Sequence, residues 1–284
     1  MKPLVFLRLL ILSTICLSSA IAHAHFNILL PSDYHMWHGR KDRATEFKVI
    51  WGHGYEHIWF DAEVPEELIA VSPSGEKTNL LDGLKKSMVT GRDGKDYRAF
   101  SLSYRPKERG DHIIAMKAAL VYDREQEVYL QDYAKSIFHV QDKLAWDRNV
   151  GMKLELVPLT RPYGLQVGGV FQAQVLLEGK PLAACEVEFE KYQRRAPSQK
   201  DTPPETFITF EAKTDPNGIV TFGLHEEGWF ALTAINVTKE HAKPNGVLAP
   251  IVERSTLWIN IAETWGNKET DSTGLSPYLK TGGN

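Results

Sequence analysis

Short runs of alternating apolar and polar residues occupy most of the chain beyond its first 24 residues. Residues 45–51, 97–104 and 186–190 each show this period of two, which is typical of β-strands that bury one face. Turn sequences, such as 72–77 and 214–218, separate one run from the next. No long segment of the sequence shows the apolar period of a helix. The pattern therefore predicts an all-β protein built from many short strands.

The strand pattern falls into two blocks, residues 25–142 and 152–262. The charged and weakly periodic stretch at 141–150 lies where they meet. Each block is long enough to bury its own core, so we expect two β-sandwich domains. The C-terminal block looks like a small immunoglobulin-like or prealbumin-like domain. Residues 263–284 are rich in Gly, Ser, Thr and Lys, and we expect them to form a disordered tail.

The first 24 residues have the features of a secretory signal peptide. Lys2 and Arg8 supply positive charge, and the apolar run at 4–17 is too short to span a membrane as a helix. Small residues mark two cleavage sites, one after Ala22 and one after Ala24. The sequence therefore predicts export to the periplasm, with no membrane insertion once the signal is removed.

The net charge and the cysteine count limit which partners the protein can bind and whether it can form a disulfide. Loss of Lys2 and Arg8 with the signal leaves 31 of the 33 basic residues against 36 acidic ones, a net charge of −5. This balance argues against binding to nucleic acid or to an anionic membrane surface. Cys185 is the only cysteine after the signal, so no internal disulfide forms. Its place in an alternating run predicts a buried core thiol.

Histidines near the cleavage sites are the first candidates for chemistry. Cleavage after Ala24 would make His25 the first residue, and its amine and imidazole could chelate one ion together. Cleavage after Ala22 would instead leave His23-Ala24-His25, whose amine, amide nitrogens and third-position imidazole form a square-planar set. Such nitrogen sets suit Ni²⁺ or Cu²⁺. Both outcomes point to a late first-row metal.

A second histidine pair follows the strand predicted at 45–51. His53 and His57 are four residues apart, a spacing that keeps both rings on one side of either a helix or a strand. Gly52 and Gly54 flank His53 and allow a tight turn. We therefore predict His25, His53 and His57 as the metal ligands. The alternative is that the pair consists of structural histidines packed among the neighbouring aromatic residues.

Five further residues form a second tier of candidates. Asp61 could orient an imidazole from outside the ligand shell. His35 and His38 could serve as an entry point for the ion, although an exposed loop is the simpler interpretation. The full second tier consists of His23, His35, His38, Glu56 and Asp61.

Several longer motifs resemble one family of secreted proteins. Residues 24–32 and 51–57 are similar to its opening motifs, and residues 156–165, 215–218 and 228–230 are similar to motifs of its second half. The family is described as the periplasmic component of cobalt and nickel transport systems that use ABC importers of the energy-coupling-factor (ECF) type. The resemblance implies that the chain captures Ni²⁺ or Co²⁺ with His25, His53 and His57 and delivers it to the membrane subunits of an importer. The family sometimes carries Met where this chain has His57.

Other functions remain compatible with these residues. An immunoglobulin-like module of the cell envelope, structural or ligand-binding, would need no metal. A copper histidine-brace oxidase would use His25 and a second histidine. Glu56 could act as the base of a hydrolytic zinc site, which usually has three protein ligands and a water. Without a nucleophile elbow or a flat aromatic platform in the sequence, we expect a metal-binding protein rather than an enzyme, with Cu²⁺ and Zn²⁺ as alternatives to nickel and cobalt.

Overall fold

The computed structural model describes residues 25–32, 35–36, 44–244 and 246–262. The expected signal peptide at 1–24 and the expected tail at 263–284 lie outside these ranges. Strands dominate the described residues, which confirms the all-β fold class. Two short 3-10 helices, Leu81–Gly83 and Glu205–Phe207, interrupt them. In the described ranges no helix has the length and apolar character needed to cross a bilayer.

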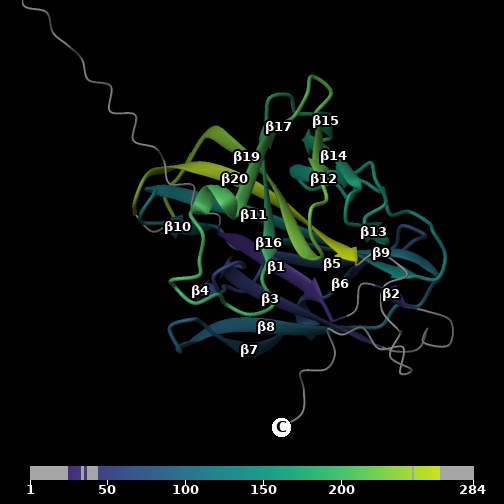
Figure 1. The fold of residues 1–284 in the computed structure, drawn as a ribbon, viewed down its shortest axis with the longest axis horizontal. Coiled ribbons are helices and arrows are strands. Elements are labelled where there is room, and N and C mark those ends of the chain that lie inside the picture. Colours follow the sequence, from purple (N-terminus) through teal and green to yellow (C-terminus); the bar gives the residue numbers. More distant parts are fainter. Residues whose placement is uncertain (1–24, 33–34, 37–43, 245, 263–284) are drawn as a thin grey trace, which may run out of the picture.

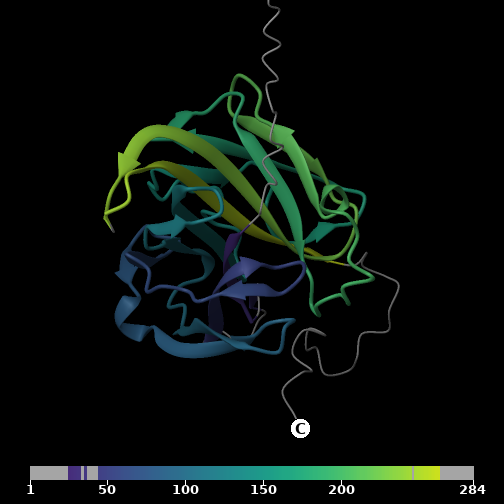
Figure 2. The same ribbon diagram turned by 90° about the vertical axis from the view of Figure 1, so that its left-hand side faces the viewer.

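The strands form three sheets that stack in layers (Figure 1). One outer sheet belongs to the N-terminal half and contains β1 (Phe26–Pro31), β3 (Thr45–His53), β4 (Ile58–Phe60), β7 (Lys85–Thr90) and β8 (Asp96–Tyr104). The other belongs to the C-terminal half and contains β12 (Leu154–Pro158), β14 (Val170–Leu177), β15 (Lys180–Pro181) and β18 (Ile219–Gly223). After a quarter turn the blue N-terminal strands still lie below the green C-terminal ones (Figure 2).

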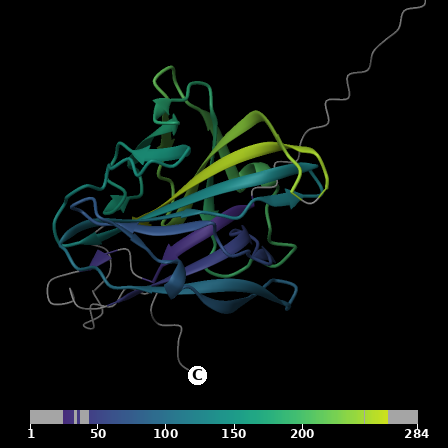
Figure 3. The ribbon, with the colours of Figure 1, turned by 180° about the vertical axis from the view of Figure 1, so that it is seen from behind.

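The central sheet contains strands from both halves of the chain. Its main path is β17 (Thr209–Lys213), β16 (Glu186–Tyr192), β19 (Gly228–Ala242), β20 (Ala249–Ala262), β11 (Val128–Val140), β9 (Gly110–Lys117), β5 (Glu67–Val71) and β6 (Lys77–Asn79). Three short strands pair beside this path: β2 (His35–Met36), β10 (Val121–Asp123) and β13 (Leu165–Gln166). The halves meet where β11 runs parallel to β20, with Tyr129 opposite Ile251 and Ser136 opposite Trp258 (Figure 3).

Two hydrophobic cores lie on opposite faces of the central sheet. Tyr133 and Ile137 of β11 join the core shared with the C-terminal outer sheet, whereas Ala134 and Phe138 join the core shared with the N-terminal one. A strand covered on both faces is buried at nearly every position, and β11 is buried almost throughout, including its polar residues Gln131, Asp132 and Lys135. The two β-sandwiches expected from the sequence are therefore built on one common sheet.

Buried polar contacts join the halves beyond this sheet. The Lys135 ammonium donates to the Glu155 carboxylate at 2.7 Å, and both side chains are almost fully buried. The Tyr163 hydroxyl donates to Asp111 at 3.1 Å and its ring stacks on His139. The motif at 156–165 thus forms part of the junction. Cys185 is buried and free, as its sequence position predicts.

Candidate metal site

The hairpin of β1 and β3 brings two of the predicted histidines together. Phe26 pairs with Gly52, so His25 and His53 lie at the next position of the same antiparallel register. Their ring centroids are 4.5 Å apart at 68°. His25 is buried, with 6% of its surface exposed, and His53 is half-buried.

Asp123 adds a carboxylate to this pair. It is the last residue of β10, a strand that pairs antiparallel with β11 and places Val121 opposite Leu130. Its Oδ1 accepts hydrogen bonds from the backbone N–H groups of Glu125 and Gln126, at 2.8 and 3.1 Å, and these fix the carboxylate. Its Oδ2 lies 3.7 Å from His25 Nδ1 and has no hydrogen-bond partner among the described residues. A carboxylate only 8% exposed therefore faces the histidine pair.

Aromatic side chains enclose the histidines. The Phe60 ring lies edge-on to His25 with centroids 4.7 Å apart, and the Trp51 ring lies 6.1 Å from the same histidine. Phe60 and Trp51 also contact each other at 5.2 Å. Removing water in this way strengthens electrostatic interactions inside the site.

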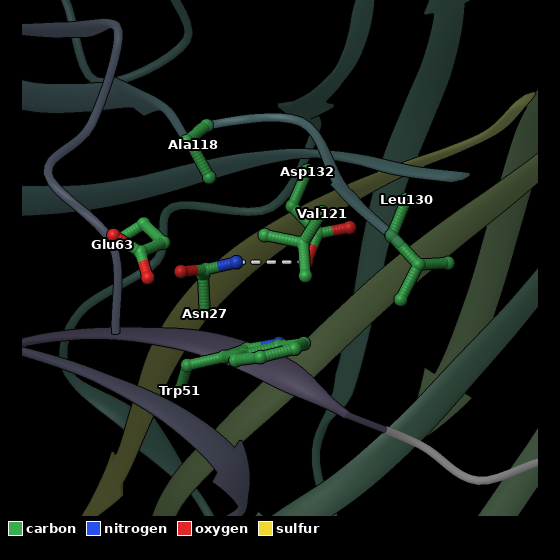
Figure 4. A pocket seen from close by; sticks show the side chains of 8 residues that line it. Asn27, Trp51, Glu63, Ala118, Val121, Leu130 and Asp132 are labelled. Atoms are coloured by element: carbon green, nitrogen blue, oxygen red, sulfur yellow. Dashed lines mark hydrogen bonds between the residues drawn. The ribbon is translucent and has the colours of Figure 1, made fainter. Parts of the chain in front are cut away.

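The cavity beside the site is too small for an organic ligand. Trp51 forms its floor, and the Asn27 amide donates to Asp132 at 2.7 Å across it (Figure 4). Its volume is about 10 Å³. A cavity of that size has room for about one water molecule. The chemistry of this region therefore depends on its ligand atoms rather than on a binding pocket.

His57 has a different environment from the one that its spacing predicts. The segment after His53 is a turn, and His57 adopts a left-handed backbone conformation with φ 57°. Its Nε2 donates to the carbonyl of Gln193 at 2.8 Å, and its ring stacks between Trp59 and Tyr192. Burial lowers the pKa of His57, which favours the neutral ring. Among the described residues it makes no ring contact with His25 or His53, so it fastens the turn to β16 instead.

Asp61 is engaged away from the histidine pair. The Asp61 carboxylate accepts a hydrogen bond from the backbone N–H of Arg98 at 2.7 Å and so supports the sheet rather than an imidazole. Glu56 lies near Glu190, whose pKa it helps to raise. The backbone of His35 pairs with that of His139. His23 and His38 lie outside the described residues.

The donor atoms of His25, His53 and Asp123 do not yet surround one point. Three ligand atoms within 4.8 Å of one another occur in the described residues only at Glu186, Glu188 and Glu211. Donors about 2.1 Å from one ion are about 3.0 Å apart at 90° and about 3.4 Å apart at the tetrahedral angle. The 3.7 Å between His25 Nδ1 and Asp123 Oδ2 is close to these values.

Comparison with known protein families identifies the family of this chain. A model of the family described as "Domain of unknown function (DUF4198)" matches residues 22–238. A search of curated proteins finds no match. Among solved structures, dimeric latent PorU from Porphyromonas gingivalis is 12% identical and Salmonella alpha-2-macroglobulin reacted with methylamine is 10% identical, with TM-scores of 0.22 and 0.20. These matches cover 86% and 84% of this chain but only 21% and 17% of those chains.

Proposed function

The chain belongs to the DUF4198 family, a domain of unknown function, and from the site we propose that it captures a late first-row transition-metal ion. The observation that carries the proposal is the meeting of two imidazoles and one buried carboxylate at His25, His53 and Asp123. Borderline ions such as Ni²⁺, Co²⁺, Zn²⁺ and Cu²⁺ accept this mixture of nitrogen and oxygen donors. The three side chains lie at the ends of three different strands, so the ion can be released when one of these ends moves.

The mature terminus would complete the ligand set. Cleavage after Ala24 would make His25 the first residue and place a free amine on the residue that supplies the first imidazole. The amine, two imidazoles and the Asp123 carboxylate would then provide four donors. Metal binding requires deprotonated ligands, so the affinity should fall as the pH drops below about 6.5, the ordinary pKa of imidazole.

Delivery to a membrane importer is the second element of the proposal. It rests on the similarity of residues 24–32, 51–57 and 156–165 to periplasmic components of cobalt and nickel transport systems. In this role the protein would bind Ni²⁺ or Co²⁺ in the periplasm and pass the ion to an ABC importer of the ECF type. The ion is cargo rather than a resident cofactor, and no chemical step on a substrate is involved.

Calorimetry on the mature chain tests the capture of metal. The chain that begins at His25 should bind one Ni²⁺ or Co²⁺ ion. His53→Ala and Asp123→Asn should each weaken binding beyond the about 10–100-fold that loss of an outer-shell partner produces. His241→Ala is the matched control, because His241 is exposed on β19. Absence of binding by the parent chain would reject the proposal, and so would full affinity in both site variants. Either result would favour a metal-free envelope module.

Copper redox chemistry is the second candidate function. Two imidazoles that face each other across a hairpin, one of them at the mature terminus, are the donors of a histidine brace. Copper-loaded protein that consumes oxygen in the presence of ascorbate, with loss of this activity in His53→Ala, would favour an oxidase. Binding of copper without oxygen consumption would favour a carrier.

A further inference from the structure

Four carboxylates line one face of the central sheet, away from the histidines. Alternation along β16 directs Glu186, Glu188 and Glu190 to the same side of the strand. Glu211 of β17 stands directly opposite Glu188 in the antiparallel register. Carboxylate oxygens of Glu186, Glu188 and Glu211 all lie within 4.8 Å of one another. Like charges directly opposite in a sheet destabilise it, so this arrangement requires a compensating interaction.

Burial makes the arrangement more costly. Glu188 is only 2% exposed, and its carboxylate has no hydrogen-bond or ion-pair partner within the described residues. Glu190 is 3% exposed, and although its Oε2 accepts a hydrogen bond from Thr209, its Oε1 has no partner in the same part of the chain. Buried carboxylates are normally paired, hydrogen-bonded or bound to a metal. Glu188 therefore lacks the partner that a buried carboxylate requires, and Glu190 is only partly satisfied.

The Arg254 guanidinium, whose charge acts on Glu188, is already paired with Asp132. The Arg254 guanidinium donates two hydrogen bonds to Asp132, at 2.7 and 2.6 Å, and acts on Glu188 only at longer range. Burial is the main cause that raises the pKa of Glu188 to about 7; Arg254 opposes this rise, and the charges of Glu211 and Glu186 contribute to it. Burial also raises the pKa of Glu190.

We propose that Glu186, Glu188 and Glu211 bind a hard divalent cation, with Ca²⁺ as the best fit. All three offer oxygen, which Ca²⁺ prefers over the nitrogen donors of the histidine site. Ca²⁺ binds oxygens at about 2.3–2.6 Å, so oxygens up to about 4.6–5.2 Å apart can reach one ion. The three carboxylates are close enough to reach one ion with small side-chain rotations. Water would supply the remaining ligands, and the affinity should resemble that of extracellular calcium modules, about 10⁻⁴–10⁻³ M.

This cation site is independent of the histidine site. It uses strands of the C-terminal half, whereas His25 and His53 belong to the N-terminal hairpin. Ca²⁺ binding would neutralise the repulsion between β16 and β17 and hold the edge of the central sheet in place. The protein would then carry a stabilising ion in addition to any transported one.

Thermal unfolding of the mature chain, freed of metal with a chelator, tests this inference. Added CaCl2 should raise the Tm at constant ionic strength. Glu188→Gln and Glu211→Gln should weaken the apparent Ca²⁺ affinity at least about tenfold, and the exposed position of Glu211 makes the second variant safe for folding. Glu67→Gln is the matched control, an exposed glutamate on β5 of the same sheet. His53→Ala should keep the Ca²⁺ response while it loses Ni²⁺ binding.

Two results would overturn the inference. In the first, Ca²⁺ does not raise the Tm of the parent chain, which would mean that Glu188 is simply kept protonated. In the second, Glu188→Gln and Glu211→Gln respond to Ca²⁺ as the parent does, which would place the ion elsewhere. Neither result affects the proposal for the histidine site, because that proposal is tested with Ni²⁺ and Co²⁺.

Discussion

Replacement of Lys135 by Met tests how strongly the two halves depend on one buried ion pair. The Glu155 carboxylate accepts hydrogen bonds from Lys135 Nζ at 2.7 Å and from the backbone N–H groups of Val150, Gly151 and Met152. Met fills nearly the same volume as Lys, so the change removes a charge without opening a large cavity. Loss of one partner from a buried pair costs about 3–5 kcal/mol. Because three backbone donors still hold Glu155, we expect the free energy of unfolding to fall by about 3 kcal/mol.

Urea unfolding followed by tryptophan fluorescence measures this loss. Lys117→Met is the matched control, because Lys117 pairs with Glu66 at a largely exposed site and such pairs contribute about 0–1 kcal/mol. Glu155→Gln should also destabilise the protein, since burial then leaves Lys135 without a carboxylate. The double variant should be more stable than the sum of the two single losses implies. A loss below about 1 kcal/mol for Lys135→Met, or strict additivity in the double variant, would refute the reasoning.

Two further predictions concern pH and backbone strain. The pKa of Glu188 rises from 4.5 to about 7 on folding, so its stabilising effect is complete below pH 4.5 and is lost as the pH rises through 7. At about 1.4 kcal/mol per pKa unit the loss is at most about 3.5 kcal/mol. Glu188→Gln should therefore flatten the pH dependence of stability from pH 5 to 8 without calcium, and an unchanged slope would contradict this. Gly52 has φ 143°, and an added Cβ would lie 2.2 Å from the Ile58 carbonyl oxygen. Gly52→Ala should therefore cost at least about 2 kcal/mol in urea unfolding and weaken metal binding, whereas Gly223→Ala, which meets no atom within 4 Å, should do neither.

The strands could be predicted from the sequence because their signal is local. The alternating runs at 45–51, 97–104 and 186–190 lie within β3, β8 and β16. The shared central sheet could not be predicted in this way. It depends on the parallel pairing of β11 with β20, strands more than a hundred residues apart, and period two gives no information about partners. The sequence of β11 does not reveal its burial either, because the buried positions include the polar residues Gln131, Asp132 and Lys135.

The histidine pair illustrates the same limit within the site. His25 and His53 meet because β1 and β3 are antiparallel neighbours in the N-terminal outer sheet, a pairing that the alternation of either strand does not specify. The prediction for His57 assumed that its segment keeps a single helical or extended geometry. The turn after His53 breaks this assumption, because the left-handed backbone at His57 turns its ring toward Gln193. Spacing arguments hold only within one regular element.

Asp123 had no signal in the sequence, and its presence changes the chemistry that the site offers. It is the last residue of the three-residue strand β10, directly before a hairpin turn. An aspartate at this position usually caps the turn, and Asp123 does so through Oδ1. Only pairing of β10 with β11 brings its Oδ2 to His25. Three neutral imidazoles would attract a divalent ion weakly in an aromatic surrounding, whereas a carboxylate adds one negative charge and a harder donor. Under the proposed function, Asp123→Asn should therefore weaken binding of Co²⁺ and Ni²⁺ more than binding of Cu²⁺, which depends more on nitrogen ligands. Equal losses for all three ions would show that Asp123 acts only by holding its turn.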